Sequence, residues 1–500
     1  MSSEGEPSSP ARNGPDQSAR VHSAPIESAP VQSSPPWGTA VVIGGSVAGT
    51  FAARVLRDHF EHVIVLDKDD LPDTPAPRKG APQGVHFHGL LARGRMIANE
   101  LFPGFVDDLI AAGAAQSSTA DSWVFQPYGW APRSESRAPS IGASRLLIEA
   151  VLRRRGRELA GVEVHPRTAV VDLLSSPSGR DVVGVRVQPD DAPPYDLPAD
   201  LVIDCSGRTS AVDRWLAARR HGDVPTTTVN AFWGYASRFY EIPDGVAPPT
   251  VGGFPIGAAS DGPPATRGGF LLLQENGRWL VTLSGCAKDF PPGDDDGFLT
   301  FADTLAFPHI GEAIRQATPL SEISLWRNTV NKRKHLDRCA SWPGAFVAMA
   351  DAVCSFNPVY GQGMSVAALE ALDLRTELEH QRATSPDLAG LGERFQRRVA
   401  GTLDVPWDAA CRSDYGVPGV EGTPAPDGYG ERLAYYERVV ALGRDDLSIY
   451  ERISATNQLV LGPSWLDDSE LVARVLADWD ELGARMGRRD PMPRGDRPAS

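Results

Sequence analysis

The chain has 500 residues, of which 41% are hydrophobic and 23% charged, and its formal net charge at pH 7 is -15. This length suits about two to three domains with a large apolar core. A net negative charge repels nucleic acid and anionic lipid, so neither nucleic acid nor a membrane is an expected partner. The five cysteines are not spaced as metal-binding pairs, which argues against a disulfide framework or a zinc site and predicts a reduced, cytoplasmic protein.

Both ends of the chain are predicted to be disordered tails. Residues 1–36 are rich in Ser and Pro, and no basic start is followed by an apolar stretch, so a signal peptide is not expected there. Residues 487–500 have a similar composition and are predicted to form a second tail.

The first ordered elements are predicted to form a strand–helix–strand unit. Residues 40–43 and 63–66 are short apolar runs typical of buried parallel strands. The turn after the first run is glycine-rich, from Gly44 to Gly49, where Gly44 permits the tight turn and Gly49 a close approach of helix and strand. Asp67 ends the second strand, where its carboxylate could accept hydrogen bonds from ribose hydroxyls. The unit predicts nucleotide binding, although Ser46 replaces the middle glycine of G-x-G-x-x-G; the alternative is a purely structural turn.

Further elements follow in chain order. Residues 145–158 are predicted to be a helix and residues 201–203 a buried strand. Between about 229 and 286 the apolar residues recur with a period of two, and Asn276-Gly277 predicts a hairpin turn. A buried strand is expected at 346–349 and a long helix from Gly363, and from about 401 the patterns are mainly helical.

Two more motifs come directly after buried strands. Asp204 opens the sequence DCSGRTS, and Asp351 follows the strand at 346–349. Next comes Phe356 to Ser365, in which Gly361 and Gly363 would let backbone N–H groups approach a planar ring at a helix start. Taken alone, each motif is equally well explained as a turn or a helix cap.

The three motifs together resemble those of the glutathione-reductase-type FAD monooxygenases. The resemblance implies that Gly44, Gly49 and Asp67 hold the ADP part of FAD. It places Asp204 and Gly207 near the pyrophosphate, and Asp351 on the ribityl chain. Ala350 stands where the family has glycine.

A narrower resemblance is to the flavin epoxidases of polyether antibiotic biosynthesis, the monensin and lasalocid type. It covers about residues 40–420 and is carried by these segments: 78–88 (RKGAPQGVHFH), Tyr128-Gly129-Trp130, Ser144-Arg145, 329–333 (TVNKR) and 356–365. It implies that Arg145 lies near the cofactor. The complete expected cofactor-binding set is Gly44, Gly45, Ser46, Gly49, Asp67, Lys68, Arg78, Arg145, Asp204, Gly207, Asp351, Pro358, Gly361, Gly363 and Met364.

The fold class implied is α/β, a Rossmann-type FAD-binding domain with an inserted β-rich substrate domain and a C-terminal helical region. We expect the FAD-binding domain at 37–222 and 335–400, the β-rich domain at 223–334 and the helical region at 401–486. Trp123, Trp130 and Trp233 are candidates to line the substrate cavity, although large aromatic side chains more often belong to the core.

The implied function is an FAD-dependent monooxygenase that uses O₂ and a flavin C4a-hydroperoxide to epoxidise an alkene in a large apolar natural product, a polyketide or terpenoid. Alternatives are an aromatic hydroxylase of a secondary metabolite, a flavin dehydrogenase or prenyl reductase, and a protein whose flavin is structural. The W-x-W-x-I-P signature of flavin halogenases is absent, which argues against halogenation. No second strand–GxGxxG–helix unit is recognisable, so we expect a separate NAD(P)H-dependent flavin reductase.

The catalytic residues are not identified by the sequence. Gln83, His86 and His88 are the candidates, on a loop expected near the flavin, and either histidine could act as a base on a phenol. A third ligand at metal spacing is missing, so no metal is expected. Hydrogen-bonded loop structure is the more ordinary explanation for the two histidines.

Overall fold

The structure is a computed structural model that describes residues 37–117, 122–126, 129–133, 140–246, 251–254 and 266–485. The tails predicted at 1–36 and 487–500 lie outside the described residues, as does Tyr128. None of the described helices has both the length and the hydropathy that crossing a bilayer requires.

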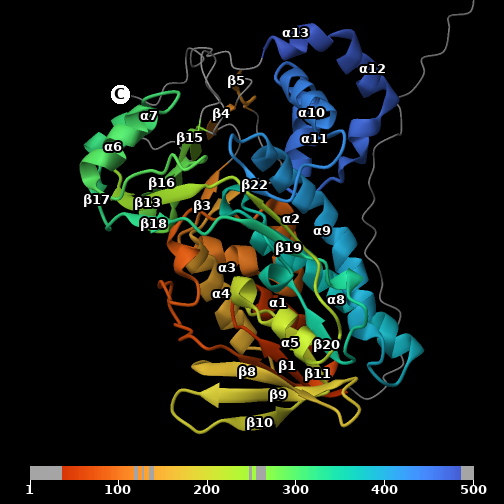
Figure 1. Ribbon diagram of the computed structural model, residues 1–500. Helices are drawn as coiled ribbons and strands as arrows, with labels where there is room; N and C mark the ends of the chain where they lie inside the picture. Colours follow the sequence, from red (N-terminus) through yellow and green to blue (C-terminus); the bar gives the residue numbers. More distant parts are fainter. Residues whose placement is uncertain are drawn as a thin grey trace, which may run out of the picture. The chain divides into compact units, whose positions relative to one another are not determined.

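A parallel sheet of five strands forms the centre of a Rossmann-like domain (Figure 1). Its order is β20-β11-β1-β2-β7, and each neighbouring pair is parallel. The bounds are β1 (Trp37–Ile43), β2 (Phe60–Leu66), β7 (Val162–His165), β11 (Leu201–Asp204) and β20 (Phe346–Ala348). The predicted strands at 40–43, 63–66, 201–203 and 346–349 are confirmed, because their apolar side chains are buried between helices on both faces.

Helices of this domain complete the same core. They are α1 (Val47–Leu56), α2 (Ala92–Leu101), α3 (Phe105–Ala111), α4 (Arg145–Arg157), α5 (Val212–Ala218) and α8 (Gly363–Thr384). The predicted helices at 145–158 and from Gly363 are confirmed as α4 and α8. Ala52, Val55 and Leu56 of α1 are buried.

An antiparallel sheet of three strands, which the sequence reading did not predict, packs beside β2 and β11. It consists of β8 (Thr168–Ser175), β9 (Val182–Pro189) and β10 (Tyr195–Pro198), at the bottom of Figure 1. Along β9, Val185 and Val187 are buried and Arg186 between them is exposed. This is the alternation that a sheet with one solvated face requires.

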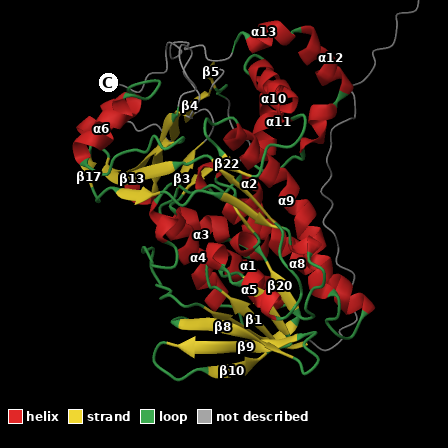
Figure 2. Ribbon diagram, viewed as in Figure 1, coloured by secondary structure: helices red, strands yellow, loops and turns green. Residues whose placement is uncertain are grey.

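The β-rich region is a second large sheet of eight strands, in which β13, β16 and β15 lie side by side (Figure 2). Its strands are β4 (Ser122–Gln126), β5 (Gly129–Trp130), β13 (Gly234–Glu241), β14 (Val251–Phe254), β15 (Arg267–Gln274), β16 (Arg278–Gly285), β17 (Thr318–Pro319) and β18 (Ser324–Trp326). The hairpin predicted at Asn276-Gly277 is confirmed, with Glu275–Gly277 as its turn and positive φ at Asn276 and Gly277. Two strands, β4 and β5, come from within the range 37–222 expected for the FAD-binding domain, so the sheet is not confined to 223–334.

Smaller elements connect these layers. Helices α6 (Asp295–Asp303) and α7 (His309–Gln316) pack on the large sheet. A pair of strands is formed by β3 (Ala115–Ser117) and β6 (Ser140–Gly142). A four-stranded sheet joins β21 (Cys354–Ser355), β19 (Asn331–Lys334), β12 (Thr226–Asn230) and β22 (Glu421–Gly422).

The C-terminal part of the described chain is mainly helical, as predicted. It contains α9 (Leu391–Tyr415), α10 (Tyr429–Gly443), α11 (Leu447–Asn457), α12 (Ser469–Ala477) and α13 (Trp479–Gly483). The expected boundary at 400/401 falls inside α9. Leu391, Phe395, Val399 and Leu403 form one apolar stripe along this helix and belong to the core around the parallel sheet, while α10 to α13 build a small core of their own.

Candidate active site

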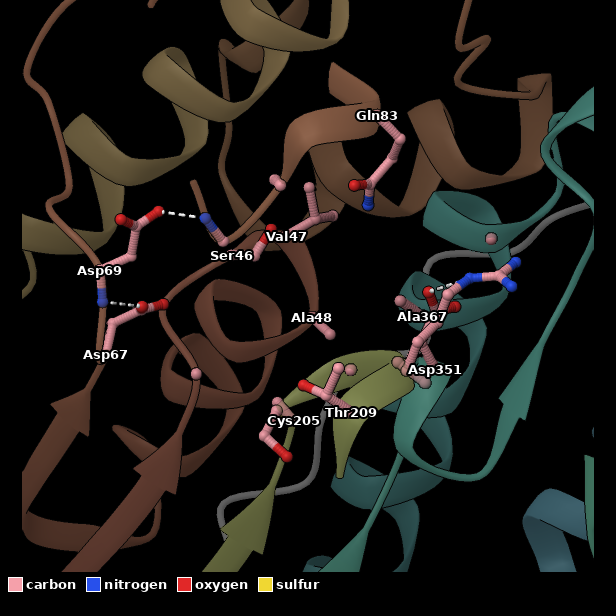
Figure 3. A pocket seen from close by; sticks show the side chains of 18 of the residues that line it. Ser46, Val47, Ala48, Asp67, Asp69, Gln83, Cys205, Thr209, Asp351 and Ala367 are labelled. Carbon is pink, nitrogen blue, oxygen red and sulfur yellow. Dashed lines mark hydrogen bonds and ion pairs between the residues drawn. The ribbon is translucent and has the colours of Figure 1, made fainter. Parts of the chain in front are cut away.

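A cavity of about 940 Å³ lies at the carboxyl ends of the parallel strands. Ile43 and Leu66 end β1 and β2 and line it, and so do Cys205 after β11 and Ala350 after β20. Ligands of open α/β sheets bind at this edge, and the volume is within the usual range for small-molecule sites. Figure 3 shows Asp67 and Asp69 on one side and Asp351 and Ala367 on the other, with Ser46, Val47, Ala48, Cys205 and Thr209 between them.

The glycine-rich turn brings the start of α1 to the cavity. Gly44 has a φ of +104°, and a Cβ there would lie 2.5 Å from the carbonyl oxygen of Cys205. Gly44, Ser46, Val47 and Ala48 line the cavity, whereas Gly45 and Gly49 lie behind it. Ser46 makes no capping hydrogen bond, and the first turn of α1 has no acidic residue. The free N–H groups there can bind an anion such as a diphosphate.

Asp67 lines the cavity and also fixes the turn. Its Oδ2 accepts a hydrogen bond from the N–H of Gly45 at 2.7 Å, and its Oδ1 accepts one from the N–H of Asp69 at 2.8 Å. A carboxylate can accept about four hydrogen bonds, so capacity remains for ligand hydroxyls. Lys68 is exposed at the rim of the cavity.

Arginines around Glu149 add positive charge near the start of α1. Glu149 accepts hydrogen bonds from Arg145 Nε at 2.8 Å, from Arg78 Nε at 3.2 Å and from Ser46 Oγ at 3.1 Å. Burial alone would raise the pKa of Glu149, but the charges of Arg145 and Arg78 outweigh it and lower the pKa to about 2. Both arginines, which belong to the expected cofactor-binding set, line the cavity, and they share this one carboxylate with Arg153. The sequence reading missed Glu149; its spacing of four from Arg145 on a predicted helix was the available signal.

Asp204 does not line the cavity, although it belongs to the expected cofactor-binding set. It is fully buried and accepts hydrogen bonds from the N–H of Ser206 at 2.9 Å and from the hydroxyls of Ser206 and Ser210, both at 2.5 Å. Burial raises its pKa, and these hydrogen bonds oppose the rise. Asp204 therefore shapes the loop from Cys205 to Thr209, whose residues, including Gly207, do line the cavity.

Asp351 lines the cavity opposite Asp67, and its Oδ2 lies 3.7 Å from Arg208 Nε. Ala350, just before it, has a φ of +57°, a conformation that favours glycine. The N–H of Ala350 donates a hydrogen bond to the buried carboxyl of Glu370. This positive φ explains why the glutathione-reductase-type FAD monooxygenases have glycine at the position of Ala350.

The start of α8 forms the other end of the cavity. Four residues of the expected cofactor-binding set line it: Pro358, Gly361, Gly363 and Met364. No side chain caps the helix, and its first turn has no acidic residue. Gln362, which was not predicted, also lines the cavity, and its Oε1 is buried without a hydrogen-bond partner among the described residues. Free backbone donors beside a free acceptor match the edge of a ring that carries carbonyl oxygens and an N–H.

The loop with Gln83, His86 and His88 lies beside this end. Gln83 and His88 line the main cavity, and all three line an adjoining small cavity of about 20 Å³. His86 Nδ1 lies 2.8 Å from Ser237 Oγ, and burial lowers the pKa of His86 to about 4. His88 Nδ1 lies 3.0 Å from the carbonyl oxygen of His86, and burial together with Arg145 lowers its pKa to about 3. Both rings are therefore neutral at pH 7. In the described ranges, no three His, Cys, Asp or Glu side chains are grouped to hold a metal ion.

The three tryptophans line neither cavity. Trp123 and Trp130 pack edge to face with ring centroids 6.0 Å apart, and Trp130 packs on the core of the large sheet. Trp233 belongs to a smaller buried cluster with Tyr235. The expected cavity-lining role is wrong for the two cavities described here, and the core interpretation holds.

No family model matches the chain. Its fold is shared with the flavin-dependent brominase Bmp2 (TM-score 0.62, 12% identity, 89% of this chain and 99% of that one). Two further solved structures share the fold. One is a flavoprotein/dehydrogenase from Cytophaga hutchinsonii, with a TM-score of 0.62 and 15% identity over 89% of this chain and 99% of that one. The other is PqsL, a probable FAD-dependent monooxygenase from Pseudomonas aeruginosa, with a TM-score of 0.54 and 13% identity over 83% of this chain and 98% of that one.

The chain therefore has the α/β fold of FAD-dependent halogenases and monooxygenases, with parallel and antiparallel sheets and C-terminal helices, as predicted. It belongs to the same family as Protein Rv3254 of Mycobacterium tuberculosis. The two sequences are 30% identical over 471 residues, which cover 91% of this chain and 96% of the relative.

Proposed function

We propose that the chain is an FAD-dependent monooxygenase that transfers one oxygen atom of O₂ to an apolar small molecule, with epoxidation of an alkene as the reaction. The observation that carries the proposal is a single cavity with an uncapped helix start at each end, α1 and α8. A dinucleotide whose central diphosphate meets the start of α1 and whose carbonyl-bearing ring meets the start of α8 suits this arrangement.

The residues at the α1 end fit the ADP part of FAD. The N–H groups of α1 together with Arg78 and Arg145 would hold the pyrophosphate, and Asp67 would accept the ribose hydroxyls. The close packing at Gly44 supports the fit, because any side chain there would strike the backbone of Cys205 and move the turn that brings α1 to the cavity.

The residues at the α8 end fit the flavin ring. Backbone N–H groups at Gly363 and Met364 would hold a ring carbonyl, and Gln362 Oε1 would accept the ring N–H. Asp351 lines the cavity and would hold the ribityl hydroxyls. When bound and reduced, FAD supplies the two electrons needed to put one atom of O₂ into a substrate and release the other as water.

The small cavity beside this end supports an apolar substrate. It shares Gln83, His88, Trp326 and Pro358 with the main cavity, and its other lining side chains are mainly aromatic or aliphatic: Phe87, Tyr235, Phe270 and Val359. Its volume of about 20 Å³ holds roughly one water molecule, so a substrate must displace lining side chains such as Trp326 to enter. His86, Thr282 and Ser284 are the polar groups there.

Aromatic hydroxylation is the second candidate, and His86 favours it. This neutral ring could accept a phenol proton. Its Nδ1 lies 2.8 Å from Ser237 Oγ, which in turn lies 2.7 Å from Thr282 Oγ1. An alkene needs no such base. A flavin dehydrogenase remains a rival, and it would consume no O₂ in proportion to product.

The test uses the purified chain with FAD, O₂ and a separate reductase that reduces the flavin. Matched alkene and phenol versions of one scaffold are offered, and products are analysed by mass spectrometry with ¹⁸O₂. We expect one labelled oxygen atom in an epoxide. Label only in the phenol ring would establish the hydroxylase, and a product without label would support the dehydrogenase.

A further inference from the structure

Asp414, in the last turn of α9, is the centre of a buried hydrogen-bond network next to the cavity. Its side chain is fully buried, and its Oδ1 accepts hydrogen bonds from Trp233 Nε1 at 2.8 Å and from Tyr360 Oη at 2.5 Å. Its Oδ2 accepts one from Asn331 Nδ2 at 2.6 Å. The three donors come from parts of the chain far apart in sequence. Trp233 directly precedes β13, Asn331 begins β19, and Tyr360 lies in the loop between β21 and α8. Burying a carboxylate is costly unless such donors satisfy it.

The network holds that last loop at two points. Tyr360 is bound to Asp414 directly, and Asn331 Oδ1 accepts the N–H of Asn357 at 2.6 Å. Asn357 in turn accepts a hydrogen bond from Tyr235 Oη, and its Oδ1 lies 3.3 Å from the N–H of Val359. Pro358 lies between the two anchor points, and Gly361 and Gln362 follow directly after the second.

These three residues line the α8 end of the cavity. Gly361 has a φ of +64°, so the chain turns sharply just after Tyr360. The conformation of the loop thus depends on contacts that lie outside the cavity, on the side facing α9.

We propose that Asp414 is a positioning residue for the flavin: through Tyr360 and Asn331 it fixes the segment Asn357–Gln362 in the conformation that meets the ring. This inference rests on the FAD site of the proposed function and deepens it, because it assigns a role there to a helix from the C-terminal region. Asp414 itself does not line the cavity.

The charge state of Asp414 provides a readout that packing alone would not. Burial raises its pKa to about 6, and the hydrogen bonds from Tyr360, Trp233 and Asn331 oppose the rise. Tyr235 and Tyr360 and the thiols of Cys286 and Cys411 face it, and burial raises the pKa of each, while the pKa of Tyr429 is raised to about 12. These groups stay neutral between pH 5 and 8. A proton on Asp414 turns one acceptor into a donor, so one of its three hydrogen bonds is lost.

The experiment measures the dissociation constant of FAD between pH 5 and 8 by flavin fluorescence. For the unmodified chain we expect binding to weaken by about tenfold as the pH falls through 6, because a hydrogen bond to a charged group is lost. Asp414→Asn presents an amide donor to Asn331, so its binding should be weak at every pH and show no midpoint. Tyr360→Phe removes a donor that lowers the pKa of Asp414, so its midpoint should move to higher pH. Asp408→Asn, an exposed position on the same helix, is the control and should match the unmodified chain.

Each alternative result has a defined meaning. If Asp414→Asn binds FAD with the unmodified affinity and pH profile, the positioning role is overturned and the FAD site stands. If the unmodified chain takes up no FAD at any pH, both the inference and the proposed function fail. If Asp414→Asn does not fold, as its melting curve would report, Tyr360→Phe decides: an unchanged midpoint overturns the inference.

Discussion

Single residues at the two ends of the cavity are under backbone constraints that can be tested directly. Ala350 is one of them, since it has a φ of +57° and its N–H donates a hydrogen bond to Glu370. A side chain in this conformation costs roughly 1–2 kcal/mol, whereas glycine adopts it freely but is more disordered in the unfolded chain. The position is close to Asp351, so its conformation also affects how that carboxylate meets a ligand.

Ala350→Gly is therefore expected to stabilise the protein, by about 0.5–1 kcal/mol in the free energy of unfolding. Urea denaturation measures the change. The matched control is Ala352→Gly in the same short turn, where the alanine is buried and its φ is not positive, so the change should destabilise. Equal losses at both positions would show that the backbone at Ala350 is not strained.

The residues that the sequence reading missed share a physical feature. Glu149 and Asp414 act through partners that only folding brings near, Arg78 for Glu149 and Trp233 for Asp414, and Gln362 is distinguished by its buried Oε1 at the cavity, which also depends on the fold. A glycine at a tight turn is recognisable locally, because its role depends on the backbone of a few neighbouring residues. A buried carboxylate on a helix has a weaker local signature: the spacing of Glu149 from Arg145 is visible in the sequence, but its contact with Arg78 is not. Asp204 is the converse case, since its place after a strand suggested a ligand contact while its hydrogen bonds stay within its own loop.

On the scale of secondary-structure elements, the contact between β1 and α1 decides whether the first turn can bind a diphosphate. A Cβ at Gly49 would lie 1.8 Å from the carbonyl oxygen of Gly44, so a side chain would push α1 away from the turn. Buried parallel strands and the glycine between them were predictable, because continuous apolar runs and tight turns are local patterns. The sheet β8–β10 was missed although its alternation was present, and the boundary at 400/401 was misplaced because the apolar stripe of α9 continues across it.

Gly49→Ala is expected to destabilise the protein by about 1–3 kcal/mol and to abolish FAD binding at micromolar concentrations, since backbone atoms must move to admit the methyl group. The control is Gly401→Ala in the exposed part of α9, where nothing lies within 4 Å of the added carbon. That change should stabilise by about 0.5–1 kcal/mol and leave FAD binding intact. Melting curves and flavin fluorescence check both variants. An FAD affinity unchanged in Gly49→Ala would contradict the proposed place of the pyrophosphate.

On the scale of the whole molecule, the described elements are organised around one ligand cavity. The parallel sheet, the loop from Gln83 to His88, the eight-stranded sheet and α8 all contribute residues to it or to the small cavity beside it. Within the described ranges there is one parallel sheet, and the glycine-rich turn of its β1 already faces this cavity. A dinucleotide domain for NAD(P)H would require a further strand–turn–helix unit of this kind.

The electron source is therefore predicted to be a second protein, an NAD(P)H-dependent flavin reductase. Mixing the FAD-loaded chain with NADH or NADPH without oxygen should leave the flavin absorbance near 450 nm unchanged over minutes. Adding a catalytic amount of a flavin reductase with free flavin should then bleach it, because reduced flavin can exchange into the site. A chain with Asp67→Ala, which should hold FAD weakly, controls for reduction of flavin that has left the protein. Rapid bleaching by either nicotinamide alone, at a rate that saturates with its concentration, would show that the chain binds the nicotinamide itself and would remove the need for a partner.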